Sequence, residues 1–315
     1  MISPESSDSN LMTGSGVEFH TGPRRVSGLP WVSVTDAQNH SCDRDDAQAT
    51  PQPTTPQVVA GVAPKGWVDH PAGLEFEYLG IADDPPVRTE YNECWAHQRE
   101  VHAEVSSHQR PSTVIYVEHD PVYTAGRRTR PEAYPFDGTP VVPVDRGGEI
   151  TWHGPGQLVG YPIVFLQRGI GVVDYVRRVE ESVIRLVAEY GLKAGRVPGR
   201  TGVWFPSDGV GPERKVCAIG IRVSRQTAMH GFALNIDPDT AGFDNIIPCG
   251  ISDADVTSMG RELRRLHGPD AEVPSMLEVA DRLEPILTEM MSFQPYEMSP
   301  DIPRRGHPAF LHPMS

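Results

Sequence analysis

The stretch RGGEITWHGPGQLVGYPI, residues 146–163, combines a glycine-rich segment with an expected strand and is the most informative part of the sequence. Its first part, RGGEITWHGPGQ, interrupts a region from Thr139 to Leu166 in which we expect two or three strands. Glycine permits positive φ and lets the backbone approach a ligand closely. A glycine-rich hairpin without a ligand is the alternative. Arg146 and His153 bracket the glycines and favour a binding loop.

Strand patterns lie on both sides of this stretch. GLEFEYLG (73–80) has the apolar and β-favouring residues of a strand, and STVIYVEH (112–119) is a β-branched run typical of a buried one. Downstream, short strands are expected in LKAGRV (192–197), TGVWF (201–205), KVCAIGIRVSR (215–225) and MHGFALNI (229–236). Proline, glycine and aspartate separate these segments, as expected of turns.

Three segments have helical periodicity. The clearest is 171–191, which ends at Gly191 and places one apolar face opposite charged residues. Another helical stripe follows Asp83, Asp84 and two prolines. A third segment, 274–293, contains Pro285, which should kink or split it. The two expected apolar stripes comprise Val172, Val176, Val179, Val183, Val187 and Tyr190, and Val87, Tyr91, Trp95, Gln98, Val101 and Val105.

Several strands mixed with a few helices, without regular βαβ alternation, predict an α+β fold with a mixed β-sheet packed by helices. Residues 1–66 are rich in Ser, Thr, Pro, Gly and Asp and are expected to form a disordered, low-complexity tail. Residues 67–293 are expected to form one catalytic domain. Residues 294–315 are again rich in proline and are expected to form a flexible C-terminal tail.

Composition excludes several classes of protein. The chain has 28 Lys and Arg against 42 Asp and Glu, a net charge of −14, which disfavours a nucleic-acid binder. No segment has the length and hydrophobicity of a membrane helix, and the start lacks the pattern of a signal peptide. A soluble, cytoplasmic protein is therefore expected. The cysteines lack CxxC spacing, so the sequence suggests neither a zinc site nor a disulfide framework.

Two further segments could carry chemistry. Lys215 opens the apolar strand KVCAIGI; such a lysine is usually only solvated, but beside a thiol it would favour the thiolate. Cys249 lies in a turn-like Pro-Cys-Gly setting. Cys42 lies in the expected tail, whereas Cys94 and Cys217 fit apolar packing. Elimination therefore favours Cys249 as a nucleophile, although on its own it supports that assignment only weakly.

Residues 146–163 closely resemble the signature of the lipoyl(octanoyl) transferases, in which Arg-Gly-Gly is followed by Thr, an aromatic residue, His and Gly-Gln before a Tyr. EHDPVYTAGRRT (118–129), KVCAIGIRV, HGFALNI and IPCGI resemble further family segments in the same order, and the likeness covers about residues 74–292. The resemblance implies the catalytic fold of biotin and lipoate protein ligases, which is like that of class II synthetases. The long N-terminal tail is the main departure from the family.

Carried over by position, the family's nucleophile falls on Cys249 and its catalytic lysine on Lys215. The resemblance implies two further substrate-binding segments. They are the acyl-binding loop of Arg146, Gly147, Gly148, Glu149, Ile150, Thr151, Trp152 and His153, and the pocket triplets Ala218, Ile219, Gly220 and Gly231, Phe232, Ala233.

The resemblance further implies an acyltransferase that moves an octanoyl or lipoyl group from acyl carrier protein to a lysine through a Cys249 thioester. Expected partners are octanoyl-acyl carrier protein, the lipoyl domains of 2-oxoacid dehydrogenase E2 subunits and the glycine cleavage H protein. A monomer is expected, with no nucleic-acid or membrane partner. A thioester is already activated, so no cofactor and no metal are expected.

Three other functions are considered. An ATP-dependent lipoate or biotin ligase would share the fold, but the GRGRxGR-type run of biotin ligases is missing, and AGRRTRPE resembles it only faintly. A papain-like protease lacks its local cysteine pattern here. A non-catalytic module that binds an acyl carrier would not require both Lys215 and Cys249.

Overall fold

The computed structural model describes residues 70–302, apart from Asp137 and residues 247–253. Its main element is a mixed sheet of eight strands. Along the sheet the order is β1 (Leu74–Leu79), β2 (Ser112–Val117), β6 (Gln157–Ile163), β10 (Thr227–Asn235), β9 (Arg214–Ser224), β8 (Arg200–Phe205) and β7 (Gly195–Val197), and β11 (Asp255–Val256) also pairs with β9.

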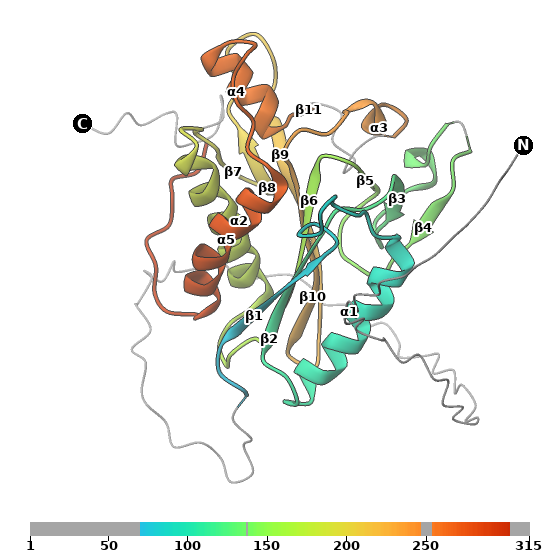
Figure 1. Cartoon of the computed structure of the whole chain (residues 1–315), viewed down its shortest axis with the longest axis vertical. Coiled ribbons are helices and arrows are strands. Elements are labelled where there is room, and N and C mark those ends of the chain that lie inside the picture. The colour runs from blue at the N-terminus through green and yellow to red at the C-terminus, as the bar shows by residue number, and fades with distance from the viewer. Residues whose placement is uncertain (1–69, 137, 247–253, 303–315) are drawn as a thin grey trace, which may run out of the picture. The chain divides into compact units, whose positions relative to one another are not determined.

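Strand direction is mixed. β1 pairs with β2 in parallel and β11 pairs with β9 in parallel, whereas the other neighbours in this sheet are antiparallel. The long β9–β10 hairpin turns at Arg225 and Gln226, whose φ angles of 50° and 58° are those of a two-residue hairpin turn. This hairpin forms the centre of the sheet (Figure 1).

A smaller, three-stranded sheet lies beside the main one, in the order β4 (Val141–Pro143), β3 (Val122–Ala125) and β5 (Thr151–His153). The short 3-10 helix Pro131–Ala133 lies between β3 and β4 in the chain. The short helix α3 (Ala241–Asp244) packs against β5. One cluster of buried apolar residues joins the small sheet to α3: Tyr123, Ala133, Ile150, Trp152, Phe243 and Ile246.

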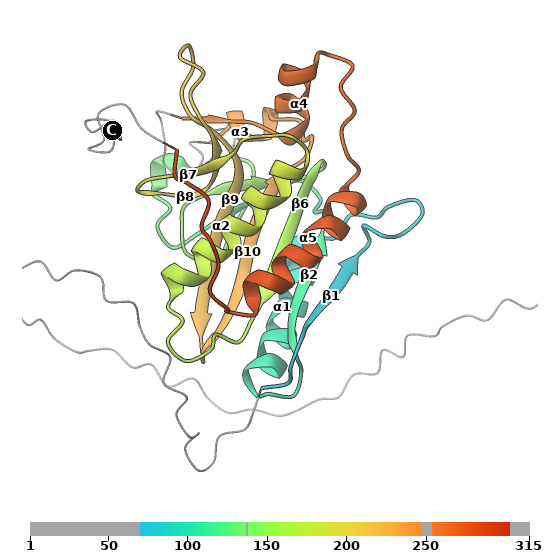
Figure 2. The same cartoon turned by 90° about the vertical axis from the view of Figure 1, so that its left-hand side faces the viewer.

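Helices cover both faces of the main sheet. α2 (Val172–Glu189) and α5 (Met276–Met291) pack side by side on one face, and α1 (Tyr91–Ser106) packs against β2, β6 and β10 on the other (Figure 2). The largest apolar cluster lies beneath α2 and α5, and a second lies beneath α1. The fold is therefore α+β, with a mixed sheet packed by helices, as the sequence predicted.

The helix expected at 171–191 is confirmed as α2. Val179, Val183 and Val187 are fully buried on its apolar face, and Gly191 has φ +75° just after its end. Val172 is the exception: it is half exposed because it is the first residue of the helix. Three-residue and four-residue spacing thus identified the helix correctly but not the burial of its first turn.

Two other helices differ from expectation. α1 begins at Tyr91, where Glu90 caps it by accepting the N–H of Glu93, so Val87 lies outside the helix and is exposed. α5 is not split at Pro285. It remains one helix because buried residues on both sides of the proline, including Leu283 and Leu287, pack into the main core. A further helix, α4 (Met259–His267), is capped by Ser258 and was not expected from the sequence.

The two tails expected from the sequence, 1–66 and 294–315, lie wholly or partly outside the described residues. The region 1–66 lies outside the described residues, as does 303–315. Residues 294–302 run along α2 and β7: Ser299 binds Glu181, and Ile302 donates its N–H to Arg196 and is buried. Within residues 70–302, leaving aside the stretches not described, no helix is long and apolar enough to cross a membrane.

Candidate functional site

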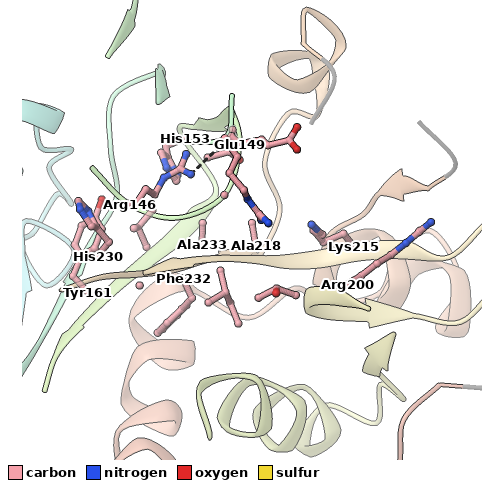
Figure 3. A pocket seen from close by; sticks show the side chains of 18 of the residues that line it. Arg146, Glu149, His153, Tyr161, Arg200, Lys215, Ala218, His230, Phe232 and Ala233 are labelled. Atoms are coloured by element: carbon pink, nitrogen blue, oxygen red, sulfur yellow. Dashed lines mark hydrogen bonds between the residues drawn. The ribbon is translucent and has the colours of Figure 1, made fainter. Parts of the chain in front are cut away.

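A cavity of about 260 Å³ lies between the β9–β10 hairpin and the loop at 146–153. Lys215 and Arg200 lie at one end of it and Tyr161 and His230 at the other (Figure 3). Of the residues that the sequence singled out, those lining the cavity are Arg146, Gly148, Glu149, Thr151, His153, Lys215, Ala218, Ile219, Gly220, Gly231, Phe232 and Ala233.

Small residues leave room above the sheet. Ala218 and Ala233 are partners across β9 and β10 and point toward the loop, whereas Phe232 points to the opposite face (Figure 3). Gly231 is required by close packing, because a Cβ there would come within 2.1 Å of the Gly160 oxygen. The expected apolar pocket triplets therefore form one continuous floor.

The loop above this floor is braced by Arg146. Its guanidinium donates to the carbonyl of Glu149 at 2.8 Å and to both oxygens of Thr124 at 2.8 Å. Gly147 donates its N–H to Ile221 of β9 at 2.9 Å. Arg146 thus shapes the loop and, since it also lines the cavity, can present part of its charge to a ligand.

Strand alternation divides the predicted loop residues into two groups. Thr151 and His153 line the cavity, whereas Ile150 and Trp152 belong to the apolar cluster with Phe243 and do not. Gly147 does not line it either. Positive φ occurs at Gly148, at +88°, and not at Gly147, so the conformational need for glycine falls on the second residue of the pair.

A chain of buried hydrogen bonds starts at His153. Its Nδ1–H donates to Gln157 at 2.7 Å, Gln157 donates to Asn235 at 2.9 Å, and Asn235 donates to the carbonyl of Thr257 at 2.9 Å. Burial lowers the pKa of His153 to about 3, so the ring is neutral at physiological pH. His153 therefore serves as a neutral hydrogen-bonding group and not as a cation.

Tyr161, near the other end of the cavity, is oriented by His119. Nδ1 of His119 faces the carbonyl of Thr89 at 2.9 Å and must donate to it, so Nε2 accepts the Tyr161 hydroxyl proton at 2.8 Å. Burial lowers the pKa of His119 to about 4, which keeps the ring neutral. The Tyr161 oxygen can then act only as an acceptor toward a ligand.

Lys215, at the opposite end, is held by an aromatic ring. It is 8% exposed, and its ammonium nitrogen lies 4.5 Å from the centre of the Trp204 ring. The pairing of β8 with β9 shifts register between Val203 and Trp204, as at a β-bulge, a feature that re-aims side chains. Gly202 has φ +119°, and a Cβ there would collide with the Cys217 oxygen and contact Cε of Lys215.

Of the four cysteines, the structure describes Cys94 and Cys217. Cys249 lies outside the described residues. Cys94 and Cys217 are buried, as expected, and burial raises the pKa of both thiols, that of Cys94 to about 12. Neither therefore has the properties of a nucleophile.

The described residues on both sides of 247–253 lie close to Lys215. Ile246 packs in the cluster with Trp152, and Val256 pairs with Lys215 across β11 and β9. A second, small cavity of about 20 Å³ is bordered by residues from both flanks and from the main site: Phe243, Val256, Lys215, Thr151, Gln157, Ala218, Ala233 and Asn235.

Sequence reasoning missed several residues that line the cavity. Some, such as Tyr161 and His230, lie in segments that it singled out, but no local pattern showed that their side chains face the cavity. The β7–β8 turn and the segment after β3 contribute polar groups, while α1, β6 and β10 contribute the end opposite Lys215. These residues are Tyr91, Arg128, Val159, Tyr161, Gly199, Arg200, Thr201 and His230.

Comparison with known proteins places this geometry in a family. Residues 90–284 match the model of the lipoyl protein ligase A/B catalytic domain. The chain is 91% identical over 265 residues to an octanoyltransferase of Cutibacterium acnes, a match that covers 84% of this chain and 97% of the relative. It is 55% identical over 215 residues to an octanoyltransferase of Mycobacterium avium, covering 68% of this chain and 89% of the relative.

A solved structure supports the fold. The bipartite lipoate protein ligase of Thermoplasma acidophilum superposes with a TM-score of 0.50 at 15% identity, covering 70% of this chain and 84% of that one. At such low identity the likeness concerns the fold alone. The matches over the catalytic domain and nearly the whole length of a relative show that this chain belongs to the octanoyltransferase family of acyltransferases.

Proposed function

We propose that this chain transfers an octanoyl group from the thioester of an acyl carrier protein to a lysine of a lipoyl domain, with Cys249 as the acyl-accepting nucleophile and Lys215 as its partner. The observation that carries the proposal is the position of Lys215, which is buried at one end of a cavity whose floor is made of small residues. A linear acyl chain fits such a floor, and a cation at its end is placed to assist a thiol.

The position of the flanking residues supports the pairing of Lys215 with Cys249. Val256, on the C-terminal flank of 247–253, is the direct strand partner of Lys215. Phe243 on the other flank borders the same small cavity as Lys215. Both flanks of 247–253 therefore lie near Lys215, which supports a role for a thiol at position 249 beside this lysine.

The proposed reaction has two steps. In the first, the Cys249 thiolate attacks the thioester carbonyl, and the carrier thiol leaves and takes up a proton, which Lys215 can supply. In the second, the neutral amine of the acceptor lysine attacks the Cys249 thioester and loses a proton to a base, and the Cys249 thiolate leaves. Backbone N–H groups of the glycine-rich loop are candidates for stabilising the oxyanion.

The proposal extends to partners and location. The acceptors would be lipoyl domains of 2-oxoacid dehydrogenase E2 subunits and the glycine cleavage H protein, and the donor octanoyl-acyl carrier protein. A lipoyl donor would react in the same way. The enzyme would act in the cytoplasm as a monomer and without ATP, because the thioester already carries the activation that a ligase obtains from adenylation.

Mass spectrometry of the intact protein tests the nucleophile. Wild-type protein mixed with octanoyl carrier protein should gain one octanoyl group, labile to hydroxylamine, on the peptide containing Cys249. Cys249→Ala should gain none. Lys215→Ala should react slowly near neutral pH and recover partly as the pH rises, because its thiol would return toward the ordinary pKa of about 8.5.

Cys94→Ala is the thiol control, because it removes a buried thiol that does not line the cavity. It should acylate at the wild-type rate. An adduct on Cys217, or wild-type transfer by Cys249→Ala, would contradict the mechanism. Transfer from free octanoate only when ATP is added would instead favour a ligase.

A further inference from the structure

His230 has a backbone conformation that is unusual for a strand. It is the fourth residue of β10 and pairs with Ile221, yet its φ is +59°. Residues other than glycine rarely adopt such angles, and where they do the conformation is often associated with a functional site. The hairpin turn explains positive φ at Gln226 but not at His230, which lies within the paired strand.

The side chain of His230 lines the cavity and is held through one ring nitrogen, Nε2. It is 1% exposed, and its Nε2 lies 2.7 Å from Oδ1 of Asp145. Burial lowers the pKa of His230 to about 4, while the His230 bond and Arg222 help to keep the pKa of Asp145 below its usual value despite partial burial. The pair is therefore a neutral imidazole that donates to a carboxylate, with Arg222 of β9 as the second partner of that carboxylate.

Asp145 links this pair to the acyl-binding loop. It directly precedes Arg146, the residue that braces the loop, and the next residue, Gly147, donates to Ile221, the strand partner of His230. The loop backbone also packs closely on β9 here: a Cβ added to Gly220 would come within 3.0 Å of the Gly147 oxygen. These contacts attach the start of the loop to the β9–β10 hairpin near His230 and Ile221.

We propose that His230 is a positioning residue that holds the acyl-binding loop over the cavity through Asp145, so that the pocket is formed before the acyl donor arrives. The expected effect on KM rests on the proposed function. The contact between His230 and Asp145 does not. A loop that is ordered only part of the time lowers apparent affinity in proportion to the ordered fraction. Loss of the pair should therefore raise KM for the acyl donor more than it lowers kcat.

His230→Gly and Asp145→Asn test the two sides of the pair. Glycine adopts φ +59° readily, so His230→Gly should remain folded while losing the donor. Each variant should raise KM for octanoyl carrier protein about tenfold and change kcat less than threefold. Amides 146–149 should exchange hydrogen faster in both. The double variant should be no worse than the more impaired single variant, because both changes remove the same contact.

His230→Gln is the rescue variant, since its amide N–H reaches the position of the imidazole Nε2 that bonds Asp145. It should recover part of the loop protection. His97→Asn is the matched control: His97 bonds Glu77 at 2.6 Å in a similar pair on α1 and β1, away from the cavity lining. It should change neither KM nor the exchange of the loop.

Two results would overturn the inference: native loop exchange together with an unchanged KM in His230→Gly and Asp145→Asn, or effects of these two changes that multiply in the double variant. The exchange measurement needs no activity, so it decides the inference even if wild-type protein fails to transfer octanoate. That failure would reject the proposed function alone.

Discussion

At the scale of single residues, the environment of Lys215 is the most informative. The ammonium lies over the Trp204 ring, and Trp204 is itself 1% exposed, so this contact is shielded from water. A desolvated cation–π contact contributes about 2 kcal/mol. Trp204 therefore holds the lysine in a defined position beside the flanks of the Cys249 segment.

Replacing Trp204 by leucine removes the cation–π contact. If about 1.4 kcal/mol of that contact stabilises the reactive position of Lys215, formation of the acyl-enzyme should slow roughly tenfold. Trp204→Phe keeps an aromatic face and should retain most of the rate. The measurement is rapid-quench mass spectrometry of the acyl adduct, with circular dichroism to confirm folding. Tyr190→Leu is the control, because it removes a similar ring beneath Arg282, and neither residue lines the cavity. Wild-type acylation by Trp204→Leu would exclude this role for the ring.

At the scale of elements, the hydrogen-bond chain from His153 connects strands that are distant in the sequence. It begins on β5, passes through Gln157 of β6 and Asn235 of β10, and ends at Thr257, the residue after β11. The Thr257 N–H in turn donates to the carbonyl of Lys215 at 2.9 Å. The loop at 146–153 and the strand that Lys215 opens are therefore linked through buried groups, for which a lost partner is costly.

Asn235→Asp should interrupt this chain while keeping the shape of the side chain. The new oxygen cannot donate to the Thr257 carbonyl and would repel it. We expect acyl transfer to fall about tenfold and the Thr257 amide to exchange hydrogen faster, since an unpaired buried group costs about 1–3 kcal/mol. Kinetics and hydrogen exchange measure the two effects. Asn92→Asp, on the exposed first turn of α1, should show neither; equal effects there would point to a general loss of stability.

At the scale of the whole molecule, buried neutral histidines make stability depend on pH. Burial lowers the pKa of His119 and His230 to about 4 and that of His153 to about 3. In the unfolded chain these groups titrate near 6.5. Between these values the unfolded state binds more protons, so the free energy of unfolding decreases as the pH falls from about 6.5 toward 4.

The melting temperature should therefore fall steadily from pH 6.5 to about pH 5.5, above the range in which most carboxylates protonate. His119→Gln, whose amide can replace both ring hydrogen bonds without titrating, should have a shallower dependence on pH. A melting temperature that is constant across this range would show that the buried rings do not control acid stability.

Much of the fold could be predicted because its signals are local. The apolar face of α2 and the β-branched run of β2 depend on spacing within one segment, and both elements are where the sequence placed them. α4 was missed because it is only nine residues long and mostly polar, so few apolar residues mark its buried face. α1 begins later than its apolar stripe predicts, because its cap is Glu90, beyond the prolines, and Val87 lies before it.

Within the candidate site, the glycine-rich loop, the small residues of the floor and the lysine that opens β9 could all be recognised from the amino-acid sequence. These are runs of neighbouring residues whose composition carries the chemistry. Which loop residues face the cavity depends on the folded chain: Thr151 and His153 do, whereas Ile150 and Trp152 point into another cluster, because strand pairing sets the direction of the alternation.

The contacts that join distant segments were likewise decided by the tertiary structure. His230 and Asp145 are 85 positions apart, and Trp204 reaches Lys215 through a register shift between two strands. No local pattern encodes such pairs, because they depend on how strands align after the chain has folded. Sequence therefore determined which groups are present at this site, and the packing of the hairpin, the loop and β8 determined which of them meet.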